Sequence, residues 1–320
     1  MFRMLILLFS HSLFAEANSC QGYGADTRGG DDSPIVEVTS LADSGPGTLR
    51  TALSDGNRRV IFKVGGTIEL KSRIEVKHSR ITLDGFTAPA QGITITKMPL
   101  AIRGASNVIV RNLRFRDSVD DNIRIHEKSR NIVIDHCSCS RAGDGAIDIT
   151  QGARDVTVSW CLLAETDKVM LVDSVTNLSI HHNLFFKDGQ RHPQLHNVRG
   201  FDVRNNVIRQ WRVYGIRARA GSKGNIINNF FGLSSNPDKP LNRAVIIVKG
   251  AEKPEANAGA IFIHGNVGPG KLNMNVLSTA SKPYACPKVD TLPASEVEAK
   301  LRKSVGARPL DTADRQYLSH

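Results

Sequence analysis

The chain has 320 residues, of which 40% are hydrophobic, and a formal net charge of +11 with a pI near 9.6. An excess of basic residues favours a polyanion as partner, although it is also compatible with a role in solubility alone. No stretch after the first twenty residues approaches the ~18 apolar residues that a membrane-spanning helix needs, which excludes that class of membrane protein.

The N-terminus has the features of an export signal. Arg3 precedes an apolar run over residues 4–14, which ends at the small-residue sequence Ala15-Glu16-Ala17. This order predicts a signal peptide over residues 1–17 and a mature chain beginning near Asn18. We expect a secreted protein, extracellular or periplasmic, with residues 18–320 forming one domain. Export argues against chromosomal DNA and favours an extracellular polyanion.

The first expected strands cover residues 35–38, 60–64 and 80–84, where apolar and polar residues alternate. Between the first two, residues 45–53 predict a short helix with Thr48 near its start. We expect this helix to cover the open end of the structure formed by the strands that follow.

From residue 107 onward the chain repeats a strand-like block every 22 to 24 residues. Each block alternates apolar and polar residues, and no interval holds a helix-period segment of ten or more residues, which excludes alternating strand and helix units. A fixed period of this length with strands and no helices predicts an all-β fold, a single-stranded right-handed parallel β-helix. The last positions of successive blocks are Leu113, Cys137, Cys161, Asn183, Asn206 and Asn229.

These last positions should stack in one column along the β-helix. Asn183, Asn206 and Asn229 are predicted to share amide hydrogen bonds as an asparagine ladder. Cys137 and Cys161 are interpreted as small buried residues, and Cys20 and Cys286 as a possible disulfide between the ends of the chain. The insert over residues 233–258 and a charged helix over 294–305 should pack on the side and top, and the C-terminus is expected to be a surface tail.

A group of carboxylates lies in neighbouring coils. Asp144 and Asp148 flank a turn and the start of a strand, and Asp121 lies 23 residues before Asp144, one coil earlier. Three acids brought together in a basic protein repel each other unless a cation lies among them. All-oxygen ligands favour calcium or magnesium, and a mobile set favours calcium. The alternative is that these acids only occupy turns.

A group of cations follows at similar spacing. Lys168 comes 20 residues after Asp148, Arg191 comes 23 after Lys168, and Arg219 comes 28 after Arg191. These spacings predict that the three lie near one edge of successive coils. Calcium at one end of a groove and cations beyond it would suit a chain of carboxylated sugars, whereas unrelated surface cations are the alternative.

An ordered set of motifs resembles the pectate lyase superfamily, polysaccharide lyase family 1. The motifs are Ile-Asp-His-Cys at 134–137, Asp-Gly-Ala-Ile-Asp at 144–148, Val-Thr-Val-Ser-Trp at 156–160, Asp-Lys-Val-Met-Leu at 167–171, His-His-Asn-Leu at 181–184 and Arg-His-Pro at 191–193. The likeness runs from about residue 20 to the segment at 305–309. It implies a calcium-dependent lyase that cleaves polygalacturonate by β-elimination. A monomer is expected by default.

The resemblance also assigns roles residue by residue. Asp121, Asp144 and Asp148 match the calcium ligands, Lys168 and Arg219 match substrate-binding cations, and Arg191 matches the catalytic arginine. Two departures are visible: the first acid is shifted within Val119-Asp120-Asp121, and His196 stands where a second arginine commonly follows the catalytic one. We count His196 as substrate-binding, with weaker or more pH-dependent contact. Retention of all three acids favours the unmethylated polymer.

Two questions stay open from the sequence. Arginine ordinarily keeps its proton, so elementary chemistry would nominate His192 or His196 as the base in place of Arg191.

Two other functions also compete with the lyase. A hydrolase on the same solenoid would need paired carboxylates, but the Gly-His-Gly and Arg-Ile-Lys motifs of polygalacturonases are missing. A non-catalytic polyuronate-binding β-helix is the second rival.

Overall fold

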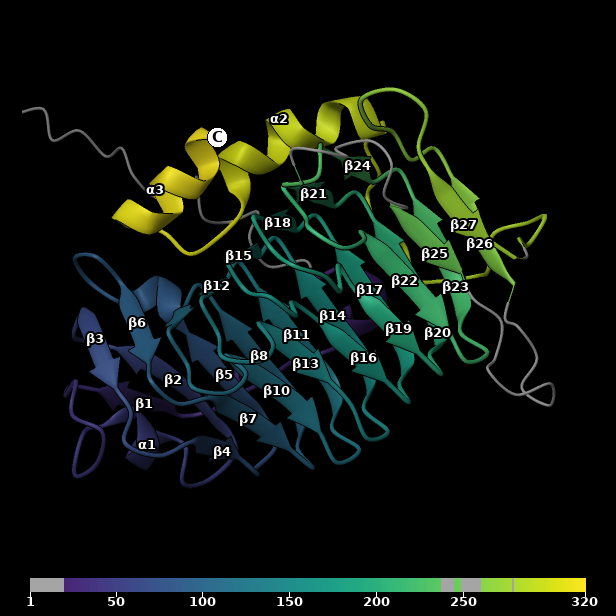
Figure 1. Cartoon of the computed structure of the whole chain (residues 1–320). Helices are drawn as coiled ribbons and strands as arrows, with labels where there is room; N and C mark the ends of the chain where they lie inside the picture. The colour runs from purple at the N-terminus through teal and green to yellow at the C-terminus, as the bar shows by residue number, and fades with distance from the viewer. Residues whose placement is uncertain (1–19, 237–244, 249–259, 278) are drawn as a thin grey trace, which may run out of the picture.

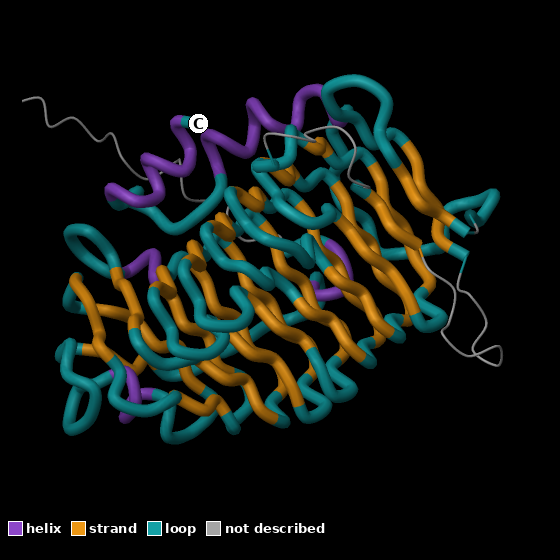
Figure 2. The backbone as a smooth tube through the Cα atoms, in the orientation of Figure 1, coloured by secondary structure: helices purple, strands orange, loops and turns teal. Residues whose placement is uncertain are grey.

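The computed structural model describes residues 20–236, 245–248, 260–277 and 279–320. Within these residues the strands form three sheets of ten, eight and nine strands, and the paired strands run parallel. Most coils contribute one strand to each wall of a right-handed parallel β-helix, so the predicted fold class is confirmed. Figure 1 shows the strands stacked side by side along the long axis, and Figure 2 shows the loops that connect them at the corners.

The strands are grouped here as sheets A, B and C. Sheet A contains β1 (Ile35–Val38), β2 (Arg58–Phe62), β5 (Ile81–Asp84), β8 (Ser106–Arg111), β11 (Arg130–Asp135), β14 (Arg154–Ser159), β17 (Thr176–His181), β20 (Arg199–Arg204), β23 (Lys223–Ile227) and β26 (Ile261–His264). Sheet B contains β3 (Gly66–Glu69), β6 (Ile93–Thr96), β9 (Arg114–Arg116), β12 (Ser138–Ser140), β15 (Leu162–Ala164), β18 (Leu184–Phe186), β21 (Val207–Arg209) and β24 (Phe230–Phe231). Sheet C contains β4 (Ile74–Val76), β7 (Leu100–Arg103), β10 (Ile123–His126), β13 (Ile147–Ile149), β16 (Leu171–Asp173), β19 (Gln194–His196), β22 (Ile216–Arg219), β25 (Ile246–Val248) and β27 (Met274–Val276).

The sequence repeat sets the register between coils. Ile132 of β11 pairs with Val156 of β14, which pairs with Leu178 of β17, and these steps of 24 and 22 residues are those of the repeat. All three side chains are buried in the central core that runs through the coils. Because successive side chains of a strand point to opposite faces, the same register also fixes which residues line the outside of each sheet.

The corner between sheets A and B carries the predicted asparagine ladder. The Asn183 side-chain amide donates to Asn206 Oδ1, and Asn206 donates to Asn229 Oδ1, each over 3.0 Å. The ladder continues one step further than predicted, because Asn229 donates to Asn266 Oδ1 over 2.9 Å. The longer insert before Asn266 hides it from a search at fixed period. In this column Cys137 and Cys161 are buried free thiols, as predicted.

The N-terminal end is covered as expected, but without a disulfide. Helix α1 (Leu49–Ala52) begins after Thr48, whose side chain accepts from the backbone N–H of Thr51. Two short 3₁₀ turns, η1 (Gly22–Gly24) and η2 (Gly85–Thr87), lie against sheet A. Cys20 and Cys286 are free thiols, so the disulfide considered from the sequence is not formed. Two cysteines far apart in sequence gave no information on their separation in space.

The C-terminal segment is not a surface tail, contrary to the sequence prediction. Helix α2 (Ala294–Ser304), predicted over 294–305, buries Val297 and Leu301 against sheet B. A second helix, α3 (Thr312–Ser319), follows it along the same side, and both are yellow in Figure 1. Within α3, Asp314 is fully buried.

Asp314 anchors helix α3 to sheet B. It accepts from Arg114 Nε over 3.2 Å, from an Arg116 terminal nitrogen over 2.5 Å and from Ser138 Oγ over 3.0 Å. These partners lie 176 to 200 residues earlier in the chain, so no local pattern could reveal them.

Two sequence predictions fall outside the described residues. The signal peptide over 1–17 does so entirely, and the insert over 233–258 does so apart from residues 233–236 and 245–248. In the part of the chain that is described, no helix has the length and apolar composition to span a bilayer.

Candidate active site

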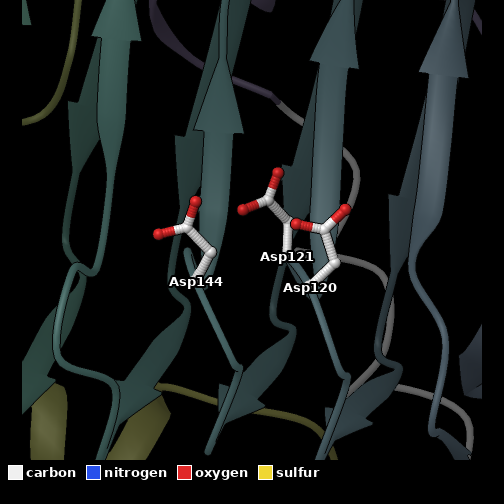
Figure 3. A group of neighbouring side chains, drawn as sticks. All are labelled: Asp120, Asp121 and Asp144. Atoms are coloured by element: carbon white, nitrogen blue, oxygen red, sulfur yellow. The ribbon is translucent and has the colours of Figure 1, made fainter.

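Three carboxylates meet on neighbouring coils at the edge of sheet C. Asp120 and Asp121 lie just before β10, and Asp144 lies just before β13 (Figure 3). One oxygen from each can be chosen so that all three lie within 4.8 Å of one another. The backbone holds this arrangement: the N–H of Gly145 donates to Asp121 Oδ1 over 2.9 Å.

Asp148, the middle residue of β13, also belongs to this cluster of acids. A Cβ atom added to Gly145 would lie 2.4 Å from Asp148 Oδ1 and 2.8 Å from Asp121 Oδ1, so both carboxylates border the space that this glycine leaves open. Asp148 is itself held by the backbone N–H of Leu171, which donates to Oδ1 over 2.8 Å. The structure thus brings together Asp121, Asp144 and Asp148 and adds Asp120, which sequence reasoning did not select.

Burial makes negative charge costly in this group. Together with a smaller effect of neighbouring carboxylates, burial raises the pKa of Asp121 to about 6 and that of Asp148 to about 7. A bound cation would remove this cost by pairing with the ionised forms. The donors are all carboxylate oxygens, as hard divalent cations such as calcium require, so the residues present fit such an ion.

Two of the predicted cations lie beside the acids, in the loops that precede the strands of sheet C. Lys168 Nζ contacts Asp144 Oδ1 at 2.9 Å. Arg191 lies one coil further along, and its charge favours the ionised form of Asp148. Its Nε is buried and has no hydrogen-bond partner among the described residues. Arg191 Nε therefore offers an unused hydrogen-bond donor at the edge that carries the acids.

Arg219 and His196 lie at the other end of these strands. They are paired in register at the ends of β22 and β19, and Asp173 at the end of β16 completes the row. His196 Nδ1 and Asp173 Oδ1 are 2.9 Å apart. The expectation that Arg219 shares an edge with Lys168 and Arg191 is wrong, because the 28-residue step from Arg191 exceeds one coil and carries it across the strand.

Two arginines of the site were missed from the sequence. Arg124 is paired in register with Asp148, and Arg217, three coils beyond Asp148, is paired in register with Gln194. Their Nε atoms are buried without a hydrogen-bond partner in the described structure, as in Arg191, and the Arg217 guanidinium lies 5.7 Å from the centre of the Tyr214 ring. Applying the coil period backward and forward from Asp148 would have found both.

The position of His192 excludes it as the base. It is 0% exposed, its Nδ1 contacts the carbonyl oxygen of Tyr214 at 3.0 Å, and its ring packs edge-on against Phe185. Burial lowers the pKa of His192 to about 4. A buried neutral ring that faces the core cannot collect a proton from a substrate outside the sheet.

Solved structures share this architecture. The major cedar pollen allergen Jun a 1 aligns with a TM-score of 0.78 at 24% identity, covering 90% of this chain and 92% of the other. A pectate lyase from Bacillus sp. N165, solved in complex with trigalacturonate, aligns with a TM-score of 0.73 at 20% identity, covering 90% and 98%. At these identities the likeness establishes the fold alone.

Sequence relatives establish the family. The protein named "Probable pectate lyase C" of Aspergillus terreus is 34% identical over 244 residues, which are 72% of this chain and 57% of that protein. The chain thus spans little more than half the length of this relative. Residues 3–253 match the family profile described as pectate lyase. The chain belongs to the pectate lyase family.

Proposed function

We propose that this protein is a secreted, calcium-dependent pectate lyase that cleaves unmethylated (1→4)-α-D-galacturonan by β-elimination and releases unsaturated oligogalacturonides. The observation that carries the proposal is the cluster of carboxylates formed by Asp121, Asp144 and Asp148. Lys168 and Arg191 lie at the same edge. Membership of the pectate lyase family supports it. The export signal predicted over residues 1–17 supports secretion, and a monomer is the expected state.

Calcium would be held by Asp121, Asp144 and Asp148, with Asp120 as a further oxygen donor. When bound, it would neutralise the carboxylate of a galacturonate unit and so make the proton on the neighbouring carbon 5 more acidic. Lys168 lies 2.9 Å from Asp144 and would bind the same carboxylate from its other side. Negative charge that develops on this carboxylate would meet fixed cations, the arrangement expected to lower the barrier most.

Arg191 would accept the proton from carbon 5. The electron pair of that C–H bond then forms the double bond between carbons 4 and 5, the bond from carbon 4 to the glycosidic oxygen breaks, and the leaving oxygen takes a proton from water. Arginine is an unusual base because its side chain ordinarily keeps its proton. The location of Arg191 in the loop one coil beyond Lys168, at the edge that carries the acids, and the burial of His192 support the assignment.

His196 and Arg219 would bind substrate at the far end of the strands. Arg219 supplies a permanent positive charge, whereas His196 is charged only when protonated. Its contact with Asp173 orients the ring and leaves Nε2 as the nitrogen available to a sugar carboxylate or hydroxyl. We expect this part of the groove to hold its substrate through Arg219 and through the missed Arg217.

Elimination is tested directly by the ultraviolet absorbance of the new double bond. With polygalacturonate at about pH 8, absorbance should rise with added calcium and stop after chelation. Fully methyl-esterified pectin should give little or no rise. New reducing ends without absorbance would indicate a hydrolase, and retention of the polymer without any product would indicate a non-catalytic binding protein.

Asp148→Asn should remove most of the stabilisation that calcium gives to the folded protein. The raised pKa values of Asp121 and Asp148 mean that protons compete with calcium as pH falls through about 7 and 6. Calcium at 100 times its dissociation constant should therefore stabilise the unaltered protein by about 3 kcal/mol at about pH 8 and not at about pH 5. The variant should show little stabilisation at either pH, measured as the shift in the thermal unfolding midpoint.

Without calcium, ionised Asp148 is expected to destabilise the folded protein. A carboxyl whose pKa is raised on folding binds more protons in the folded state, so its contribution to stability declines as pH rises from about 4 to about 7. With chelator present, Asp148→Asn should thus be more stable than the unaltered protein at about pH 8 and similar to it at about pH 4. Equal midpoints at the higher pH would contradict a destabilising charge at Asp148.

A further inference from the structure

A column of cations runs along the corner where sheet C leads into sheet A, away from the carboxylates. The first residues of five successive sheet A strands are paired in register, and all five are exposed. They are spaced by about 4.8 Å, the distance between neighbouring strands. From β11 to β23 they are Arg130, Arg154, Thr176, Arg199 and Lys223.

Most of this column is not neutralised by nearby acids. Arg154 has a weak pairing with Asp155 at 3.4 Å. In the described structure Arg130, Arg199 and Lys223 have no carboxylate partner within 4.0 Å. Many other arginines of the β-helix do, among them Arg103 and Arg204. An uncompensated row of charge favours an extended polyanion that lies along the corner.

A hollow of about 510 Å³ lies at the Lys223 end of the column, within the usual size range of a ligand site. Two of its cations, Arg199 and Lys223, are cross-strand neighbours, and small residues leave its floor open. A Cβ added to Gly200 would lie 3.1 Å from Asn177 Oδ1 and 3.4 Å from Tyr23 Oη. Asn197, Arg199, Lys223 and Tyr284 line the hollow with larger side chains.

Tyr284 is fixed in place beside these cations. Its hydroxyl donates to the carbonyl oxygen of Ala260 and its backbone N–H donates to Asn225 Oδ1, both over 2.9 Å. The ring is half-buried and so presents a rigid apolar surface at the wall of the hollow. A rigid aromatic ring beside cations and an amide is suited to a sugar acid, whose ring has an apolar C–H face, hydroxyls and a carboxylate.

We propose that this hollow is a second carbohydrate site, which binds one uronate unit of an acidic polysaccharide whose chain continues along the cation column. Arg199 and Lys223 bind the carboxylate, the Tyr284 ring packs on the C–H face of the sugar, and the Asn197 amide bonds a hydroxyl. The identity of the polymer rests on the proposed function. Anchoring here raises the effective concentration of the same polymer at the groove on sheet C.

The test compares two double variants that each remove two exposed positive charges. Arg199→Gln with Lys223→Gln alters the hollow, and Lys300→Gln with Lys303→Gln alters helix α2 as the matched control. Affinity for long polygalacturonate is measured by retardation in gels that contain the polymer, with chelator present so that calcium does not contribute to binding. The hollow variant should bind roughly tenfold more weakly, and the control should bind like the unaltered protein.

Three further results decide the proposal. Polyglutamate, which is anionic but has no sugar ring, should bind the unaltered protein more weakly than polygalacturonate and should distinguish the variants less. Equal loss of affinity in both double variants, or equal binding of polyglutamate, would overturn the site in favour of a general effect of charge. Unfolding midpoints of all proteins should agree, because both pairs are exposed.

Measurements of elimination distinguish a failure of the second-site proposal from a failure of the proposed lyase function. Trigalacturonate is too short to need the second site, so its elimination by the hollow variant should match that of the unaltered protein, while cleavage of dilute long polymer slows. Absence of elimination in every protein would reject the lyase and leave the binding comparison intact. Normal elimination with unchanged affinity of the hollow variant would reject the second site and leave the lyase intact.

Discussion

Replacing Arg191 with alanine is expected to lower the rate of polygalacturonate elimination by about 10³-fold, the usual contribution of a positioned base. Arg191 lies at the edge that carries the acids, and its Nε has no hydrogen-bond partner in the described structure, so the substitution removes the proposed base without breaking a hydrogen bond of that nitrogen. Elimination is followed by ultraviolet absorbance, and the stabilisation by calcium should be unchanged because the acids remain.

Arg212→Ala is the matched control for this prediction. Arg212 lies in the loop of the next coil and forms an ion pair with Asp167, but its side chain is 60% exposed. We expect its loss to change the rate less than threefold, since an exposed pair contributes about 0–1 kcal/mol. Substantial activity in Arg191→Ala would remove Arg191 from the base role and direct attention to His196, which lies partly exposed at the end of β19 in sheet C.

Replacing Asp314 with alanine is expected to destabilise the protein by about 3–5 kcal/mol, the cost of breaking buried ion pairs by removing one partner, with only the longer contacts to Asp311 remaining. Asp314 is 0% exposed and binds both Arg114 and Arg116, which are themselves 1% and 3% exposed. Its loss would leave two guanidinium groups beneath helix α3. Urea unfolding followed by circular dichroism measures the difference.

Asp311→Ala provides the comparison. Asp311 also lies near both arginines, at 3.4 Å, but it is partly exposed and its main contact is with the first turn of α3, where its side chain accepts from the backbone N–H of Asp314. Its loss should cost about 1 kcal/mol, as for other helix N-caps. If Asp314→Ala were no more destabilising than Asp311→Ala, the buried ion pairs would not be what holds α3 in place.

Much of the fold could be predicted because the repeat is local. A strand-like block that returns every 22 to 24 residues allows only neighbouring coils to pair, and the resulting register aligns Ile132 with Val156 and Leu178. The asparagine ladder and the proximity of Asp121, Asp144 and Asp148 follow from the same period. Wherever one coil lies directly on the next, spacing along the chain determines neighbours in space.

The remainder depended on tertiary structure, because the period carries no information across longer distances. The burial of Asp314 joins a C-terminal helix to strands almost 200 residues earlier, and the 28-residue step before Arg219 places it at the far end of its strand. Burial likewise decided against His192. The amino-acid sequence by itself determined the β-helix and the group of acids, whereas only the packed structure decided which charges are buried with partners and which remain free to bind a ligand.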